Sequence, residues 1–268
     1  MNTRRIGRHG WWCAGLALLA GTGCWQNPRP TMQQLERGLV WVFPGVEGGP
    51  WSMQWACRSF RDAGADQAIE IFDWQRLGGT LANLTDYPGN RQRAAAVAER
   101  IAAYRAAHPG TPIDLVGYSG GGGVAVFVVE ALPEDVRLRH VILAQAALSP
   151  DYDLTRALRR VDGALVSFHS PYDWAILGAG TAVWGTMDRK HVESCGKVGF
   201  DAERAVPDAT LRGRLVQRGW GREMLEVGHT GGHAPILTYE WNKRFVAPYL
   251  LVGPPAGGDA DGRRIAGE

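Results

Sequence analysis

The sequence predicts an α/β protein built on a mostly parallel sheet with helices on both faces. Short continuous apolar runs, which are typical of strands buried on both faces, alternate with longer segments of helical periodicity. This alternation favours one sheet whose parallel strands are joined by helices. We expect strands at residues 38–43, 68–72, 113–116, 136–146, 164–168 and 222–227, and helices at 51–63, 91–107, 120–132 and 235–249.

The expected elements near the start of the chain have clear boundaries. The first strand is an apolar run that ends at Pro44-Gly45, where the chain enters a loop. The next helix places Trp51, Trp55 and Phe60 on one side.

The longest expected helix, at 91–107, is rich in alanine. It repeats Val97, Ile101 and Tyr104 at helical intervals, and a proline and a glycine at 108–110 end it. A third apolar strand follows, and after it a glycine-rich helix start. The final helix is expected from its position after the last strand.

Composition limits the classes of function. The chain of 268 residues is 45% hydrophobic and 21% charged, which suits one globular domain with a sizeable core. Its 29 basic and 27 acidic residues are spread without a long block of either sign, for a formal net charge of +2. We therefore expect no nucleic-acid partner.

The first residues predict export. Arg4, Arg5 and Arg8 precede a short apolar run at 11–20, about half the ~20 residues that a membrane-spanning helix needs. The small residues before Cys24 resemble the end of a bacterial lipoprotein signal, although Gly21 stands where that pattern prefers an aliphatic residue. The resemblance implies that Cys24 is lipidated and anchors the protein to a membrane. A cleaved, fully soluble secreted form is the alternative.

These observations suggest boundaries along the chain. We expect a signal peptide at 1–23, a polar, proline-containing tether at 24–36, a folded domain at 37–252 and a flexible tail at 253–268. After removal of the signal, Cys57 and Cys195 are the remaining cysteines besides Cys24. Outside the cytoplasm these two could form a disulfide, and two buried free thiols are the alternative.

The strongest chemical motif surrounds Ser119. The run Gly117-Tyr118-Ser119-Gly120-Gly121 has the form Gly-x-Ser-x-Gly and lies between an apolar strand and a helix start. Glycines two residues before and after the serine let strand and helix approach closely, so that the hydroxyl is presented on a strained turn. A glycine-rich turn without function is one alternative. Dinucleotide binding by the run 120–125 is another, but these glycines fall inside the helix and lack the acidic residue expected about 20 residues later.

With this motif in this setting, the chain resembles the α/β-hydrolase superfamily over residues 38–251. The resemblance implies a triad in the order serine, acid, histidine, with the acid after a late strand and the histidine after the last one. Asp173 follows the strand at 164–168 and is the expected acid. Asp151 and Asp153 are the reserve candidates.

Two histidines follow the last expected strand. His233 follows glycines and precedes the final helix, as the histidine of the family does, and is the expected base. His229 is the alternative base. A metal site built on this pair lacks an evident third ligand, and we expect no metal or cofactor.

Two backbone N–H groups are needed to stabilise a developing oxyanion. Gly120, directly after the serine, is expected to supply one. The loop Pro44-Gly45-Val46-Glu47 resembles the His-Gly-x loop of the family with Pro44 in place of histidine, which implies Val46, or else Glu47, as the second donor. An ordinary Pro-Gly turn is the alternative.

Together these residues predict a serine hydrolase that acts on small-molecule or lipid carboxylic esters through an acyl-enzyme. About 20 residues separate the strands near Leu143 and Val166, too few for a cap domain, so we expect a fairly open site. An acyltransferase or a peptidase would use the same triad. A further alternative is a surface binding module that has the same fold but no catalytic activity.

Overall fold

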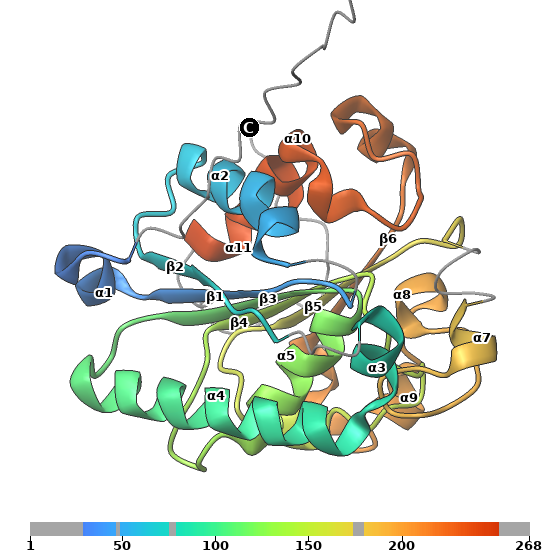
Figure 1. The fold of residues 1–268 in the computed structure, drawn as a ribbon, viewed down its shortest axis with the longest axis horizontal. Coiled ribbons are helices and arrows are strands. Elements are labelled where there is room, and N and C mark those ends of the chain that lie inside the picture. The colour runs from blue at the N-terminus through green and yellow to red at the C-terminus, as the bar shows by residue number, and fades with distance from the viewer. Residues whose placement is uncertain (1–28, 47–48, 75–78, 174–179, 252–268) are drawn as a thin grey trace, which may run out of the picture.

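A six-stranded, entirely parallel sheet forms the centre of the molecule (Figure 1). The computed structural model describes residues 29–46, 49–74, 79–173 and 180–251. The strand order is β2-β1-β3-β4-β5-β6. The strands are β1 (Leu39–Phe43), β2 (Ala68–Ile71), β3 (Ile113–Tyr118), β4 (His140–Ala144), β5 (Leu165–His169) and β6 (Leu215–Gly219).

Helices cover both faces of this sheet, as Figure 1 shows. On one face lie α4 (Tyr87–Ala107) and α5 (Gly120–Ala131), and on the other lie α2 (Gln54–Asp62) and α11 (Ala247–Leu251). The predicted parallel sheet with helices on both faces is confirmed. The remaining elements are short: α1 (Met32–Arg37), η1 (Pro50–Met53), α3 (Gly79–Thr85), α6 (Thr155–Leu158), α7 (Thr181–Trp184), α8 (Cys195–Val198), α9 (Ala202–Ala205), η3 (Ala209–Arg214), η4 (Arg222–Val227), η5 (Pro235–Leu237), α10 (Tyr239–Trp241) and η6 (Asn242–Val246).

The sheet separates two hydrophobic cores. Because successive side chains of a strand point to opposite faces, Trp41 and Phe43 of β1 join the core under α4 and α5. Val40 and Val42 join the core under α2 and α11. Both sets are buried, which explains why β1 has an uninterrupted apolar sequence.

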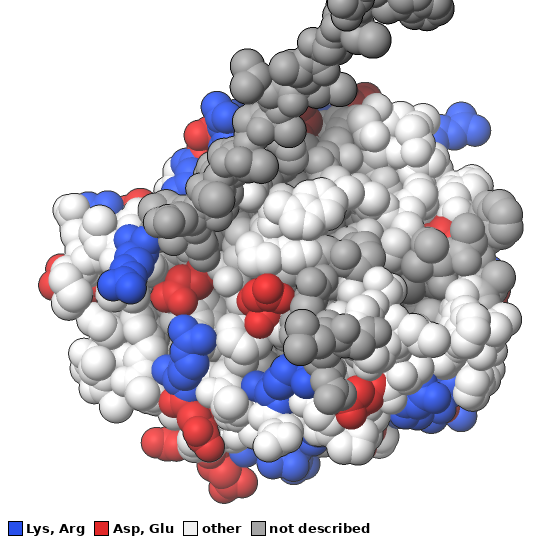
Figure 2. Space-filling model, in the orientation of Figure 1, with Lys and Arg blue, Asp and Glu red and all other residues white. Residues whose placement is uncertain are grey.

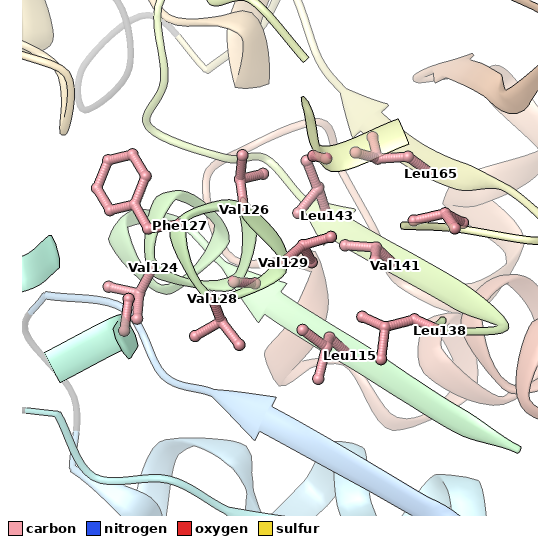
Figure 3. Packing of buried hydrophobic residues seen from close by; sticks show 14 of the residues in the cluster. Leu115, Val124, Val126, Phe127, Val128, Val129, Leu138, Val141, Leu143 and Leu165 are labelled. Atoms are coloured by element: carbon pink, nitrogen blue, oxygen red, sulfur yellow. The ribbon is translucent and has the colours of Figure 1, made fainter. Parts of the chain in front are cut away.

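Helix α5 is buried all round and packs against β1, β3 and β4 of the sheet and against α4. Every residue from Gly120 to Glu130 is buried. Figure 3 shows Val129 pointing toward Leu143 and Val141 of β4, whereas Phe127 points away from these strands. This burial holds the amino-terminal end of α5, and with it the turn at Ser119, in a fixed position relative to the sheet.

The glycines around Ser119 let three backbone segments meet. A Cβ atom on Gly117 would lie 2.6 Å from the Cα of Gly122, so these two glycines bring β3 and α5 together. A Cβ atom on Gly121 would lie 2.2 Å from the carbonyl oxygen of Pro44. The glycine run therefore serves the close packing of α5 against β3 and the loop after β1.

Within the described residues no cap domain covers the carboxyl ends of the strands. Only α6 lies between β4 and β5. No helix in the described part of the chain is both long and apolar enough to cross a membrane.

The last strand differs from the prediction. Residues 222–227, expected as a strand, form the 3₁₀ helix η4, and the last strand is β6. As an edge strand, β6 is only partly buried and carries Gln217 and Arg218, so its sequence lacks the continuous apolar run that marks the other strands. The predicted helix at 235–249 is interrupted once: Thr238 is extended and separates η5 from the continuous helix of α10, the π-helical η6 and α11, and the side chain of Asn242 donates to the carbonyls of Ile236 and Thr238.

The expected tether is shorter than predicted, because residues 32–37 form helix α1. Thr31 and Gln34 cap this helix reciprocally, each side chain bonding the backbone of the other residue. Leu35 packs against the core, and Tyr104 donates a hydrogen bond of 2.6 Å to its carbonyl. The signal peptide, Cys24 and the tail after residue 252 lie outside the described residues.

Cys57 and Cys195 are free, buried thiols. Cys57 belongs to the core under α2, and Cys195 belongs to the core on the opposite face of the sheet. Burial raises the pKa of Cys57 to about 12 and also raises that of Cys195. The sheet between them therefore excludes the disulfide in this fold, and the alternative of two buried thiols applies.

We predict that Gly121→Ala lowers the free energy of unfolding by about 3 kcal/mol, because the added methyl group would overlap the backbone of Pro44. Urea denaturation measures this loss. Gly213→Ala is the matched control, since a Cβ atom there meets nothing within 4 Å and should change stability by less than about 1 kcal/mol. Equal denaturation midpoints for Gly121→Ala and the unmodified protein would contradict the packing described for α5.

Candidate active site

Ser119 lies on a strained turn at the carboxyl end of β3. Its φ of 53° and ψ of −122° are unusual for a residue other than glycine. The turn is held by backbone hydrogen bonds: Ser119 N–H donates to Ala144 O at 3.1 Å, and Ser119 O accepts from Gly122 and Ala147 at 3.0 Å each. This is the conformation that the Gly-x-Ser-x-Gly motif requires between strand and helix.

A chain of hydrogen bonds links Ser119 to two partners that come from distant parts of the sequence. Ser119 Oγ lies 3.0 Å from His233 Nε2, and His233 Nδ1 lies 2.6 Å from Asp173 Oδ2. With the carboxylate accepting from Nδ1–H, Nε2 is the unprotonated nitrogen and accepts the hydroxyl proton of Ser119. The structure thus brings together the three residues expected from sequence as nucleophile, base and acid.

Burial differs along this chain. Ser119 is 2% exposed and the Asp173 side chain 1%, whereas the His233 side chain is 14% exposed. The carboxylate therefore lies behind the imidazole, away from solvent. Such an arrangement strengthens the electrostatic stabilisation of a protonated His233.

His229, the alternative base, has a different environment. Its ring packs edge-on against Trp241 at a centroid distance of 5.7 Å, and within the described residues it makes no hydrogen bond to Ser119. Burial lowers the pKa of His229 to about 4, opposed in part by the charge of Asp173. His229 is therefore a neutral, buried packing residue beneath the loop that carries His233.

Three side chains anchor the carbonyl groups of the His233 loop. Trp220 Nε1 donates to His229 O at 2.9 Å, Ser170 Oγ to Gly231 O at 2.6 Å, and Gln145 Nε2 to Gly232 O at 3.0 Å. Anchoring both residues directly before His233 fixes the approach of its imidazole to Ser119.

Gln145 and Ser170 were not identified from the sequence. A usable signal was present, since each is a polar residue placed directly after a buried strand, β4 and β5 respectively. The carboxyl ends of parallel strands meet at one edge of the sheet. Polar residues at these positions therefore converge on the same site as Ser119.

The expected oxyanion donors lie side by side. A Cβ atom on Gly120 would come within 2.3 Å of Val46 Cγ1, so Val46 contacts the first turn of α5. The loop of Val46 is held by two side chains: Trp74 Nε1 donates to Pro44 O at 2.8 Å, and Asn83 Nδ2 donates to Val46 O at 3.2 Å. Glu47, the other candidate, lies outside the described residues.

The reserve acids lie in other interactions. Asp151 accepts hydrogen bonds from Lys190 at 2.7 Å and from Arg204 at 2.9 Å, and the bond from Lys190 lowers its pKa. Asp153 accepts from the backbone N–H of Thr155 at the start of α6. Among the described residues, no group of three or more His, Cys, Asp or Glu side chains could hold a metal ion.

Known proteins offer similarity of structure only. No protein-family model matches the chain, and no curated protein matches it either. Among solved structures, the esterase domain of a Rhodothermus marinus protein is 16% identical with a TM-score of 0.43, covering 83% of this chain and 87% of its own. A predicted CIB-like hydrolase from Thermoplasma acidophilum is 14% identical with a TM-score of 0.44, and the match covers 83% of this chain and 89% of the hydrolase. Trichoderma reesei cutinase is 15% identical with a TM-score of 0.36, and the match covers 81% of this chain and 75% of the cutinase.

Proposed function

We propose that the protein is a serine hydrolase that cleaves carboxylic esters through an acyl-enzyme. The observation that supports this proposal most directly is the continuous hydrogen-bond chain from Asp173 through His233 to Ser119. A serine hydroxyl is a weak nucleophile until an adjacent base can remove its proton. His233 is within hydrogen-bond reach to do so.

The proposed reaction has two halves. His233 Nε2 takes the proton of Ser119 as Oγ attacks the ester carbonyl, and the N–H groups of Gly120 and Val46 stabilise the resulting oxyanion. The protonated His233 then gives this proton to the leaving alcohol, which forms the acyl-enzyme. Water, deprotonated by His233, attacks the acyl group, and the proton returns to Ser119 as the carboxylic acid leaves. Asp173 stays ionised and stabilises the imidazolium formed in each half.

Exposed apolar side chains that lie close in sequence to the site residues support an ester with an apolar portion. Trp51 follows the oxyanion loop, Tyr172 precedes Asp173 and Leu237 follows His233 by four residues, and these three side chains are 67%, 57% and 41% exposed. Figure 2 shows that the upper right of this face, toward which the strands run in Figure 1, carries few charged side chains. An uncharged surface of this kind favours a neutral ester over a charged one.

Substitution of the nucleophile tests the proposal. We predict that Ser119→Ala lowers kcat on p-nitrophenyl butyrate by at least about 10³-fold and abolishes labelling by a fluorophosphonate probe. Ser194→Ala is the matched control: Ser194 is also fully buried, and its Oγ has no hydrogen-bond partner among the described residues. Retained labelling of Ser119→Ala would refute the assignment.

Separate substitution of the two histidines tests the choice of base. We predict that His233→Ala lowers kcat by at least about 10³-fold, because this change removes the imidazole that lies 3.0 Å from Ser119 Oγ. His229→Gln should keep kcat within about tenfold, since His229 packs beneath the loop without contacting the serine. The reverse pattern in steady-state kinetics would make His229 the base.

We also propose that the protein is exported and anchored to a membrane through a lipid on Cys24. The supporting feature is the basic and then apolar segment that ends in small residues before Cys24. We predict that Cys24→Ala moves the protein from the membrane pellet to the soluble fraction after cell lysis. Cys13→Ala, within the expected signal, should leave it in the pellet; equal fractionation of the two variants would contradict lipidation of Cys24.

A further inference from the structure

We infer that the protein has a second binding site, for a phosphate-type anion. This site lies at the amino ends of the strands, at the end of the sheet opposite Ser119. A cavity of about 390 Å³ opens there, lined by Glu134, Arg137, Arg159, Arg160, Asp162, Leu211 and Arg214. Arg137 comes shortly before β4, Arg160 before β5 and Arg214 directly before β6. The cavity therefore lies at the amino ends of these strands, whereas Ser119 follows the carboxyl end of β3.

The lining carries an excess of positive charge. Four arginines face two carboxylates, those of Glu134 and Asp162, whose side chains are 96% and 58% exposed. A further carboxylate, Asp208, lies 3.5 Å from Arg159. Even with Asp208 counted, positive groups outnumber negative ones, and the acids extend into solvent where their charge is screened.

Arg160 is the central group of this site. The residue is only 7% exposed, and its Nε donates to Leu132 O at 3.2 Å. Its terminal nitrogens make no hydrogen bond to a described residue, and the nearest carboxylate oxygen, on Glu134, is 3.8 Å away. These terminal nitrogens are not fully enclosed by protein, so an anion that enters the cavity can pair with their N–H groups.

The other arginines are held in position by backbone carbonyls. Arg214 Nη1 donates to Leu158 O at 3.1 Å and to Val161 O at 2.7 Å, and Arg137 Nη1 donates to Glu134 O. A carbonyl fixes the guanidinium without neutralising it, so the charge of Arg214 stays available. The charge of Arg137 is partly offset by Asp162, whose Oδ1 lies 3.8 Å from Arg137 Nε. Such preorganisation reduces the entropic cost of binding an anion.

The geometry favours a phosphomonoester over a carboxylate. Several guanidinium groups around one cavity match the multiple oxygens and double charge of a phosphate, which arginine binds in a bidentate manner. The volume lies at the small end of ordinary ligand pockets, and Leu211 is the one apolar residue of the lining. The ligand is therefore a phosphate with a small polar substituent, either a soluble ester or a lipid headgroup. Helix α1 leads into the amino end of β1 and so lies at the same end of the sheet as the cavity.

Isothermal titration calorimetry on the full chain tests this site, with inorganic phosphate and glycerol phosphate as probes and chloride at matched ionic strength as the blank. We expect saturable binding of both probes with Kd on the order of 1 mM or tighter. Arg160→Gln should weaken binding at least about tenfold, and Arg159→Gln, at an exposed position that folding tolerates, about fivefold. Arg156→Gln is the matched control, because Arg156 is exposed on α6 but does not line the cavity.

Vesicle sedimentation separates the two sources of phosphate. Binding to phosphatidic acid vesicles that is stronger than binding to phosphatidylcholine vesicles, and that Arg159→Gln reduces, identifies a lipid headgroup. Binding of glycerol phosphate without this vesicle preference identifies a soluble ester. No heat above the chloride blank, or equal weakening by Arg156→Gln and Arg159→Gln, would overturn the proposal.

Discussion

The close approach of β3, α5 and the loop after β1 is the constraint on which the rest of the structure depends. Gly117 meets Gly122, and Gly121 meets the backbone of Pro44, at distances that no larger residue allows. Ser119 is thereby held at a positive φ with its hydroxyl directed toward His233. The complete burial of α5 keeps this turn from relaxing, because its helix has no exposed side toward which it could shift.

Around this turn the sheet assembles the remaining groups. Asp173 follows β5, Gln145 follows β4, and Ser170 lies between β5 and Asp173. All three therefore lie at the carboxyl ends of the strands, where Ser119 lies. Asp173 orients the imidazole directly, while Gln145 and Ser170 orient it through the carbonyls of the preceding residues. We propose that these supports give the base its precision, since proton transfer requires a defined distance between His233 and Ser119.

The central part of the fold could be predicted because its strands are buried on both faces and carry apolar side chains throughout. The edge strand β6 could not, since its partly exposed residues include Gln217 and Arg218, while the apolar residues of η4 resemble a strand. The sequence predicts a tether where α1 lies, because a helix of six residues has almost no periodicity and its stability comes from capping and from contacts with Tyr104. Of the site, the sequence indicates the groups that belong to a chemical motif, whereas Gln145 and Ser170 belong to none, and their positions directly after β4 and β5 are the one signal that places them at the site.

The two ends of the sheet's strands carry different groups, with Ser119 at the carboxyl ends and the arginine-lined cavity at the amino ends. The central claim concerns the carboxyl ends and is tested most directly by mapping a fluorophosphonate adduct by mass spectrometry of the intact and digested protein. The account predicts one adduct per chain, on Ser119, formed at a rate that falls sharply in His233→Ala. An adduct on a different residue would contradict the proposed role of the Asp173, His233 and Ser119 chain. The same rate of adduct formation in His233→Ala and in the unmodified protein would contradict it as well.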